Sequence, residues 1–485
     1  MYFIGTDVGT TGTKTVVSDE HGRVIGKGYY EYELHAYQGG RVEQDAGDWW
    51  RAVVYSVREA LAGISDKENV LAMSLSAQGG STLAVDKDFT PISPAYTWMD
   101  ARAAHECGEI AKEHAEYVYN TSGWRSDPCF DPPKMRWLAK NEPDVFNKAY
   151  QFVSTVEYVN YKLTGRSVTD PSCAAMRQLI SVHTSDWDDK LLDLAGITRE
   201  RLPECLPAGA KVGSLTKEAA AELGLSESVA VYNGAHDQYC ASIGSGAARP
   251  GDLLLSTGTT WVVLGVTDTP LFTESLLSPG VHPVSGLYGN IASLNSAGSA
   301  LKWFGKLTGE TDFACIDKGA EERMHSAENI LFYPYYAGAG FPHHAPDVKA
   351  SCIGMELMHD KYDLARALME GAAFETRCVL EEFEKHGAKT SSLKMVGGAA
   401  KSPLWTQITC DVTKCEIMIP EEKDTCCIGA AIIAAVGCGF YPDFLTAADK
   451  MVHYSKTMYP IRENAEFYER KYARYKAGFE SLKVI

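Results

Sequence analysis

The first part of the chain alternates short β-rich runs with one long helical pattern. Residues 2–6 and 13–18 are rich in β-branched and aromatic side chains, and a turn signal at 19–22 precedes the β-rich run 23–30. Between 45 and 61, behind an aspartate that can cap a helix, apolar side chains recur at helical spacing: Trp50, Val53, Val54, Val57 and Leu61. This mixture of strands and helices predicts an α/β protein.

The second half of the chain repeats the opening pattern. Residues 252–256 and 261–266 are expected to be strands around the turn Thr257-Gly258-Thr259-Thr260, which matches Gly9-Thr10-Thr11 between the first two strands. One strand–Gly-Thr-Thr–strand unit in each half predicts two similar domains that face each other across a cleft. The Gly/Ala-rich stretch 244–250 is the expected boundary, so that the domains would span residues 1–246 and 247–485.

Composition and charge narrow the classes of partner. The 45% of apolar and 22% of charged residues are typical of a globular protein, and 46 basic against 63 acidic side chains give a net charge of −17. Such an acidic surface repels nucleic acid and anionic lipid, so neither is expected as a partner. The longest apolar run, 428–436, is too short to span a bilayer. Thirteen cysteines without a paired motif, and an opening without a signal-peptide pattern, predict a cytoplasmic protein.

The two Gly-Thr turns are candidates for binding phosphate. Glycine lets backbone N–H groups converge on an anion, the hydroxyls of Thr10, Thr11 and Thr259 would add donors, and Lys14 is a nearby cation. Each turn alone is better explained as an ordinary hairpin turn, in which Gly and Thr are common. Two copies flanked by strands favour phosphate binding. The chain contains neither a Walker motif nor the glycine motif of dinucleotide-binding turns.

Two aspartates are candidates for the chemistry. Asp7, on the first hairpin beside the first turn, suits a Mg²⁺ ion held largely through water. Asp237, between small residues, suits a general base that accepts the proton of a hydroxyl group attacking a γ-phosphate. The alternative for each is a helix cap or a turn. This alternative is strong for Asp237, which could cap a helix running through Cys240 and Ile243.

A Gly-Gly turn at 397–398 lies between an expected strand and an expected helix. Such a turn lets a flat ring lie against the backbone, with Ser402 as a ligand contact or a helix cap. Taken alone, the segment is slightly better explained as an ordinary strand-to-helix loop. His343 and His344 are adjacent, so their rings diverge on any regular element, and a surface or loop role is expected rather than a zinc site.

In their order and spacing these motifs resemble those of the FGGY family of carbohydrate kinases, in the sugar kinase–actin–Hsp70 superfamily. The resemblance covers nearly the whole chain. It includes a Trp-x-Asp-x-Arg element from Trp98 to Arg102 and a Gly-Ala-His-Asp element that ends at Asp237. The other segments that carry it are 7–14, 43–50, 134–138, 295–309, 342–371, 397–399 and 424–431.

The resemblance implies two ribonuclease-H-like domains of the actin and Hsp70 type around a hinged cleft. ATP would lie mainly on the second domain and the sugar mainly on the first. Carried over residue by residue, the resemblance makes Asp237 the catalytic base and assigns Mg²⁺ to Asp7 and Asp237. The residues expected to approach ATP are Thr10, Thr11, Lys14, Thr259, Gly298, Lys302, Gly398 and Ser402. Those expected to bind the sugar are Gln78, Gly79, Gly80, Trp98, Asp100, Arg102, Asp237 and Gln238.

The sugar side departs from the family pattern. Xylulokinases typically read Gln-Met-His-Gly where this chain reads Gln78-Gly79-Gly80-Ser81, so glycines replace the bulky pair that contacts the sugar. This replacement implies a roomier pocket or a different contact. The His236-Asp237 pair is more similar to kinases of deoxy-ketoses such as fuculokinase.

The resemblance therefore predicts an ATP-dependent kinase that phosphorylates a terminal hydroxyl of a ketose, a pentulose or a deoxy-ketose. A non-catalytic regulator that responds to sugar or nucleotide is the alternative from another class, although Asp7 and Asp237 are both present. A kinase for a polyol or a larger sugar also stays open, whereas a chaperone-type ATPase would need a peptide-binding domain for which the length leaves no room. Sugar and ATP are the expected partners. The oligomeric state is open, with a homodimer admissible.

Overall fold

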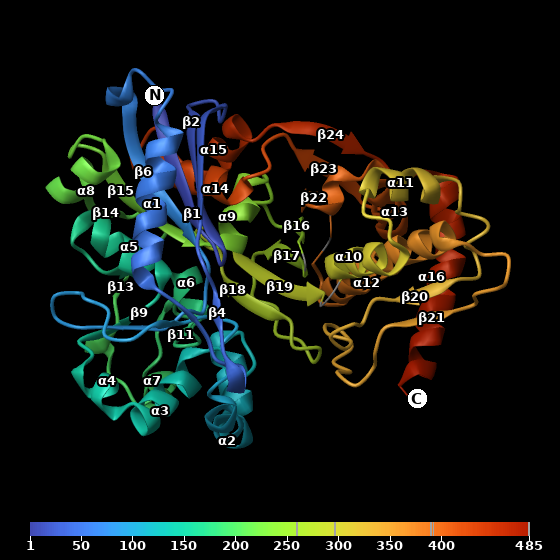
Figure 1. The fold of residues 1–485 in the computed structure, drawn as a ribbon, viewed down its shortest axis with the longest axis horizontal. Coiled ribbons are helices and arrows are strands. Elements are labelled where there is room, and N and C mark those ends of the chain that lie inside the picture. The colour runs from blue at the N-terminus through green and yellow to red at the C-terminus, as the bar shows by residue number, and fades with distance from the viewer. Residues whose placement is uncertain (259, 295–296, 389, 391, 484–485) are drawn as a thin grey trace.

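The computed structural model of the chain describes residues 1–258, 260–294, 297–388, 390 and 392–483. They form two lobes, each built on one large sheet (Figure 1). The first sheet contains, in spatial order, β14 (Lys211–Ser214), β15 (Ala230–His236), β6 (Val70–Ala77), β1 (Tyr2–Val8), β2 (Gly12–Asp19) and β3 (Val24–Glu31). The second contains β18 (Ser278–Val281), β19 (Tyr288–Leu294), β17 (Trp261–Thr267), β16 (Asp252–Thr257), β22 (Ser392–Gly397), β23 (Glu416–Pro420) and β24 (Tyr454–Met458).

The two sheets share one arrangement of their five central strands. In the first sheet β1, β2 and β3 are antiparallel neighbours, while β6 and β15 continue on the other side parallel to β1. In the second sheet β16, β17 and β19 are antiparallel neighbours, while β22 and β23 run parallel to β16. This common order confirms the predicted pair of ribonuclease-H-like α/β domains. The Gly-Thr-Thr turns occupy equivalent places, between β1 and β2 and between β16 and β17.

Helices of the first lobe cover its sheet and build the lower part of that lobe in Figure 1. They are α1 (Ala46–Ala60), α2 (Ala104–Ser122), α3 (Asp131–Asn141), α4 (Pro143–Lys148), α5 (Thr155–Thr164), α6 (Pro171–Ala175), α7 (Asp189–Ala195), α8 (Lys217–Leu223) and α9 (Asp237–Gly244). The predicted helix over 45–61 is α1, and the Asp45 carboxylate caps it by accepting from the Gly47 N–H. Most of its expected apolar face is buried.

Helices of the second lobe include a long one that crosses the lobe and the chain's last helix, which packs beside it. They are α10 (Ala297–Thr308), α11 (Phe313–Glu321), α12 (Lys361–Lys385), α13 (Pro403–Thr413), α14 (Thr425–Gly437), α15 (Phe444–Met451) and α16 (Arg462–Leu482). Three aromatic rings of α16 contact the Phe374 ring of α12, namely those of Tyr468, Tyr472 and Tyr475. The expected boundary between residues 246 and 247 stays a prediction.

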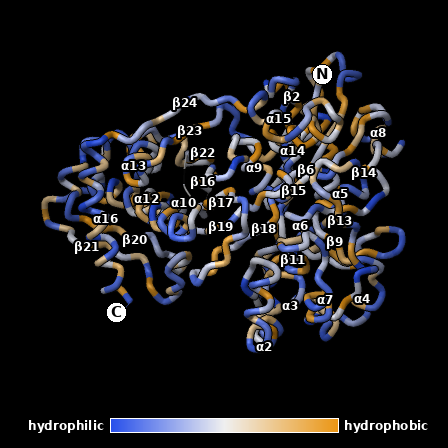
Figure 2. The backbone as a smooth tube through the Cα atoms, turned by 180° about the vertical axis from the view of Figure 1, so that it is seen from behind, coloured by the Kyte–Doolittle hydropathy of each residue, from blue (hydrophilic) through white to orange (hydrophobic). Residues whose placement is uncertain are grey.

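Short strands complete the fold. The small sheets are β4 (His35–Ala36) with β5 (Val42–Gln44) and β8 (Ala95–Tyr96), β7 (Leu83–Val85) with β9 (Gln151–Val153), β10 (Val168–Thr169) with β13 (Glu204–Cys205), β11 (Ile180–Ser181) with β12 (Asp186–Trp187), and β20 (Leu331–Tyr333) with β21 (Ser351–Ile353). Figure 2 shows apolar stretches along the strands and central helices, and hydrophilic stretches along outer loops. Within the described ranges, no helix has the length and apolar character needed to cross a membrane.

The two lobes meet where α14 crosses α9 and β1. A Cβ added at Gly429 of α14 would lie 1.9 Å from the carbonyl oxygen of Cys240 in α9, and one added at Gly244 would lie 2.0 Å from the carbonyl oxygen of Thr425. One added at Gly5 of β1 would lie 1.8 Å from the carbonyl oxygen of Cys427. The backbones therefore approach more closely than any side chain would allow. A continuous apolar cluster joins α9, α14 and both sheets around this crossing.

Candidate active site

The parallel strands β1, β6 and β15 end at one edge of the first sheet. Asp7 is paired in register with Ser76 of β6, and His236 at the end of β15 is paired with Ala77, so that Asp237 follows at the same edge. The Ser76 hydroxyl donates to Asp7 Oδ1 over 2.7 Å. The structure thus brings Asp7 and Asp237 together, as the resemblance implied. Asp237 is the first residue of α9, but its Oδ1 accepts no hydrogen bond from any described residue, so nothing supports a capping role for this atom.

The carboxyl of Asp7 is electrostatically strained. Burial, and after it the charge of Asp237, raise the pKa of Asp7 from 3.8 to about 7, although the Ser76 hydroxyl and Lys14 act in the opposite direction. Two carboxyl groups that share a partly dry site favour a cation between or beside them. Oxygen ligands of this kind are those that Mg²⁺ prefers, so the residues present fit a magnesium ion.

A cavity of about 460 Å³ opens beside these carboxyl groups, between the lobes. It is lined by Thr10, Gln78, Gly79, Gly80, Trp98, Asp237 and Gln238, all of which the resemblance assigned to substrate or phosphate. The second lobe closes the other side with Val262, Leu276, Ser278, Ile291, Ala292, Ser293, Gly340, Phe341 and His344. A ligand here would contact both lobes, as the cleft model requires.

A chain of hydrogen bonds joins the first turn to the sugar side of this cavity. The Trp98 indole N–H donates to Thr10 Oγ1 over 3.0 Å, and the ring remains 45% exposed on the cavity wall. Gln44 donates from Nε2 to the Thr10 carbonyl over 2.6 Å and accepts from Gln78 Nε2 over 2.9 Å. Gln78 Oε1 is buried without a partner in the described part of the chain. Gln44 therefore links the first Gly-Thr turn to Gln78 through hydrogen bonds.

Asp100 and Arg102 are not among the residues that line this cavity. The Arg102 side chain is only 2% exposed and pairs with Asp100 Oδ2 at 2.8 Å and with Glu43 Oε1 at 2.5 Å. Its guanidinium also stacks 3.9 Å above the centre of the Tyr96 ring. We expected both residues to contact the sugar. Here Arg102 pairs with Asp100 and with Glu43, beside the segment that carries Trp98, and the contact of Asp100 and Arg102 with the sugar stays a prediction.

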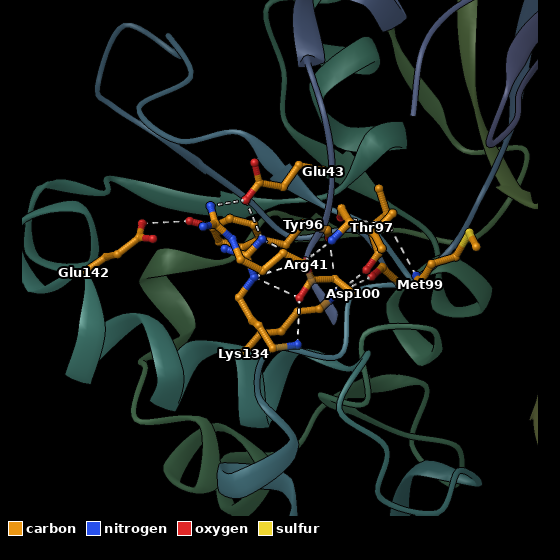
Figure 3. A network of polar contacts seen from close by, with 11 residues as sticks. Arg41, Glu43, Tyr96, Thr97, Met99, Asp100, Lys134 and Glu142 are labelled. Atoms are coloured by element: carbon orange, nitrogen blue, oxygen red, sulfur yellow. Dashed lines mark hydrogen bonds and ion pairs between the residues drawn. The ribbon is translucent and has the colours of Figure 1, made fainter. Parts of the chain in front are cut away.

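Buried Lys134 contacts the same segment. Its ammonium donates to the carbonyl oxygens of Gly80 at 3.0 Å, Tyr96 at 3.2 Å and Thr97 at 2.7 Å (Figure 3). Burial lowers the pKa of Lys134. Three converging carbonyl groups account for a buried lysine that has no carboxylate within ion-pair distance in the described chain. The hydrogen bond from Lys134 to Gly80 holds in place a backbone segment that lines the cavity between the lobes.

A second cavity, of about 760 Å³, lies within the second lobe. Gly298, Lys302, Gly398 and Ser402, four of the residues expected at the nucleotide, line it together with Thr257, Gly258 and the apolar side chains of Leu301, Phe313 and Leu404. Within 4 Å of a Cβ added at Gly258 or Gly398, the described part of the chain places a single neighbour, a carbonyl oxygen at 3.4 Å. These glycines leave room for a ligand against the backbone, which fits a nucleotide. Thr259 lies outside the described residues.

Hydrogen bonds connect the second Gly-Thr turn to the Gly-Gly turn. The Gly398 N–H donates to the Thr257 carbonyl over 2.8 Å, and the Ala399 N–H donates to Thr257 Oγ1 over 3.0 Å. Ser402 caps α13 by accepting from the Trp405 N–H over 2.9 Å, which confirms the helix-cap alternative, and it also lines the cavity. Cap and ligand contact are therefore compatible at Ser402.

Lys14 is engaged in an ion pair. Its Nζ lies 3.0 Å from Asp424 Oδ1, immediately before α14, and Lys27 contacts the other oxygen of the same carboxylate at 3.1 Å. Although burial opposes it, Lys14 and Lys27 hold the pKa of Asp424 below its usual range. The contact of Lys14 with phosphate stays a prediction, and in this geometry Lys14 links the first turn to the second lobe.

Sequence reasoning missed the contact that crosses the cavity mouth. Arg125 Nη1 donates to His344 Nδ1 over 3.0 Å, from the first lobe to the second. His344 Nε2 donates in turn to the Ser275 carbonyl, and burial lowers the pKa of His344, with Arg125 lowering it further. His344 occupies a loop, as expected, but it also lines the cavity. No motif marks Arg125, because its partner is more than two hundred residues away in the sequence.

Two lobes of this topology, with paired carboxyl groups at a sheet edge, a cavity between the lobes and a glycine-lined cavity in the second lobe, define a phosphotransferase of the sugar kinase class. The models of the N-terminal and C-terminal domains of the FGGY family of carbohydrate kinases match residues 2–244 and 253–438. The chain belongs to this family, whose members use ATP, and is a carbohydrate kinase.

Known members of the family are similar over their full lengths. A xylulose kinase from Bacillus subtilis (strain 168) is 28% identical over 100% of this chain and 98% of that protein. A gluconokinase from Bacillus licheniformis is 28% identical over 97% of this chain and 94% of that protein. The crystal structure of a xyloylose kinase from Brucella ovis superposes with a TM-score of 0.94 at 27% identity and covers 100% of both chains. These relatives do not agree on one sugar.

Proposed function

We propose that the chain transfers the γ-phosphate of ATP to a terminal hydroxyl of a ketose, a pentulose or a deoxy-ketose. The observation that carries this proposal is the position of Asp237, whose carboxylate faces the cavity between the lobes at the same sheet edge as Asp7. An acceptor in that cavity and a nucleotide in the second lobe would meet at these two carboxyl groups. The loss of one of them would favour the alternative of a non-catalytic regulator, and both are present.

Asp237 serves as the general base. Its carboxylate accepts the proton of the sugar hydroxyl as that oxygen attacks the γ-phosphorus, and the bond to the leaving ADP oxygen breaks. Asp7 and Asp237 would hold Mg²⁺, which, when bound, neutralises charge on the phosphate oxygens. The Thr10 turn positions the transferred group. Closure of the two lobes excludes water, so that the sugar oxygen attacks.

The cavity suits a polyhydroxylated acceptor. Gln78 Oε1 and Gln238 Oε1 are buried acceptors without a partner in the described chain, and both residues line the cavity. Sugar hydroxyl groups would donate to them, since an unpaired buried acceptor is costly. The exposed face of Trp98 offers an apolar platform for the C–H groups of the sugar.

A sugar acid is a second candidate acceptor, favoured by Arg125. This arginine lines the cavity, and its guanidinium contacts no carboxylate among the described residues; its partner is His344, whose pKa is lowered by burial. An aldonate carboxylate would supply the missing negative charge by a bidentate pair. The gluconokinase among the relatives is consistent with such an acceptor.

The experiment is a coupled ADP-release assay over pentuloses, deoxy-ketoses, polyols and D-gluconate. We expect turnover with a pentulose or deoxy-ketose, whereas turnover confined to gluconate would establish the sugar-acid alternative. The matched control is Asp237→Ala, for which we expect loss of phosphoryl transfer with ADP affinity retained. If the native chain binds ATP but turns over no member of the panel, the kinase proposal is wrong and the regulator alternative is favoured.

A further inference from the structure

The side chain of His236 forms a wall of the sugar cavity directly beside the proposed base. His236 is the last residue of β15, it is only 5% exposed, and it lines the cavity together with Asp237. Its backbone N–H donates to Ser172 Oγ over 3.0 Å, and Ser172 Oγ donates to the Asp170 carboxylate over 2.7 Å. These buried hydrogen bonds hold the backbone of His236, whereas Nδ1 of its imidazole is buried without a hydrogen-bond partner in the described chain.

The imidazole occupies space that Gly79 leaves empty. A Cβ added at Gly79 would lie 2.8 Å from His236 Cδ2 and 2.6 Å from both Cβ and Cγ of Met176. Distances this short are excluded, so a side chain at position 79 and this placement of His236 and Met176 are mutually exclusive. The xylulokinase pattern Gln-Met-His-Gly has Met and His at positions 79 and 80. This chain instead supplies a methionine and a histidine from other elements, next to a loop that carries only glycine.

The same imidazole contacts the carboxylate of Asp237. Nε2 of His236 lies 3.1 Å from Asp237 Oδ1, and that oxygen is buried with no hydrogen-bond donor from any other described residue. An N–H at Nε2 that points towards Oδ1 leaves Oδ2 for the hydroxyl of the acceptor. The contact is not aligned as a hydrogen bond in this structure, and a rotation of the imidazole would align it.

We propose that His236 is a positioning residue: its imidazole orients the Asp237 carboxylate through Nε2, and its ring, with Met176, sets where the sugar lies above Gly79. This inference rests on the proposed function, because it assigns to Asp237 the proton of the acceptor. It accounts for the glycine at 79 as a requirement of the imidazole and Met176 rather than as a loss of contacts. The imidazole thus has two separate roles: its N–H orients the carboxylate, and its volume positions the sugar.

Two variants separate these features. His236→Phe keeps a ring of similar size but removes the donor, and His236→Gln keeps an N–H that can reach Asp237 but removes the ring. We expect kcat to fall about tenfold or more in His236→Phe, with the KM for ATP within about twofold of native. We expect His236→Gln to recover most of that kcat but to raise the KM for the sugar about fivefold, because the wall is lost.

His282→Gln is the matched control. His282 is also buried and contacts the same Tyr239 ring, at 5.8 Å between centroids against 6.0 Å for His236, but it does not line the cavity. It reports what the loss of a buried histidine does to the fold alone. We expect its kcat and its KM for the sugar to stay within about twofold of native even where its Tm falls.

Several outcomes would overturn the inference. If kcat of His236→Phe stays within about threefold of native, or if His236→Gln is no more active than His236→Phe, the imidazole does not position the base. ADP affinity and Tm report whether each variant folds. If His236→Phe does not fold, Gly79→Ala is decisive, because its methyl group must displace Met176, the imidazole or both, which together form the wall; an unchanged KM for the sugar would refute the wall. No turnover by the native chain would refute the proposed function itself, and the inference with it.

Discussion

Replacing Asp7 by Asn tests the electrostatic account of the site. In the absence of Mg²⁺ and nucleotide, the charged Asp7 carboxylate lies in a partly dry position beside Asp237, and this raises its pKa to about 7. An asparagine removes the charge and can still accept the hydrogen bond of Ser76 through its amide oxygen. We therefore expect the variant to be inactive but more stable than the native chain under these conditions.

The magnitude follows from the pKa. A carboxyl whose pKa rises from 3.8 to about 7 on folding costs roughly 4 kcal/mol of folding free energy at pH 8, at 1.36 kcal/mol for each pH unit. Asp7 retains some contact with solvent, which screens its charge, so we expect a gain of about 2–3 kcal/mol for Asp7→Asn. For a lobe of this size, such a gain raises the Tm by a few degrees.

The sign of the pH dependence is fixed. The unfolded chain loses the Asp7 proton near pH 4 and the folded chain near pH 7, so the folded state binds more protons in between, and native stability falls as the pH rises through this window. The advantage of Asp7→Asn should thus be greatest above pH 7 and shrink towards pH 5. Thermal unfolding of both proteins in EDTA, at pH 8 and pH 5, measures it.

Asp424→Asn is the control, for which we expect a change in Tm of the opposite sign. Lys14 and Lys27 lower the pKa of Asp424, so its charge stabilises the fold, and neutralising it should lower the Tm at pH 8. If Asp7→Asn also lowers the Tm at pH 8 in EDTA, the raised pKa of Asp7 and the like-charge repulsion from Asp237 are refuted.

Three further changes test other parts of the site. Arg102→Ala leaves the buried Asp100 carboxylate without its cation, while Glu43 keeps its ion pair with Arg41, so we expect a loss of about 3–5 kcal/mol of stability by chemical denaturation, and an unchanged midpoint would contradict a structural role for Arg102. Gly398→Val places two methyl groups in the nucleotide cavity and should raise the KM for ATP about tenfold while the KM for the sugar is unchanged; equal effects on both would argue against the assignment of this cavity. Arg125→Ala should raise the KM for D-gluconate at least tenfold more than that for a ketose if the carboxylate binds there, and parallel changes would exclude the sugar-acid candidate.

Local patterns in the sequence were sufficient to predict the α/β fold and several of its strands and helices. Strands and turns are encoded by neighbouring residues, so the β1–β2 and β16–β17 hairpins and helix α1 could be predicted, and the resemblance brought Asp7 and Asp237 to one site. The Trp98–Arg102 motif indicated the right segment. It could not indicate that Trp98 faces the cavity while Asp100 and Arg102 face inward, because that depends on a partner, Glu43, supplied by another strand.

The remaining cavity residues depend on packing between distant segments. Met176 follows the short helix α6, Arg125 follows α2, and His344 belongs to a loop of the second lobe, so no spacing along the chain joins them. The imidazole of His236 fills the space beside Gly79 because β6 and β15 end side by side. This contact is likewise visible only in the folded structure. Tertiary contacts of this kind leave no periodic signal in a single sequence.

The glycine contacts between α14 and the first lobe locate the pivot of the molecule. Gly5, Gly244 and Gly429 let main chains touch, so we expect a closing movement of the lobes to turn about this crossing. Displacement in a rotation grows with distance from the axis. Asp7 lies two residues beyond Gly5, and Asp237 begins the helix that Gly244 ends, so in such a movement these two carboxyl groups would be displaced less than the more distant residues of the second lobe. Closure of the lobes would thus move the bound substrates towards Asp7 and Asp237, which would themselves move little.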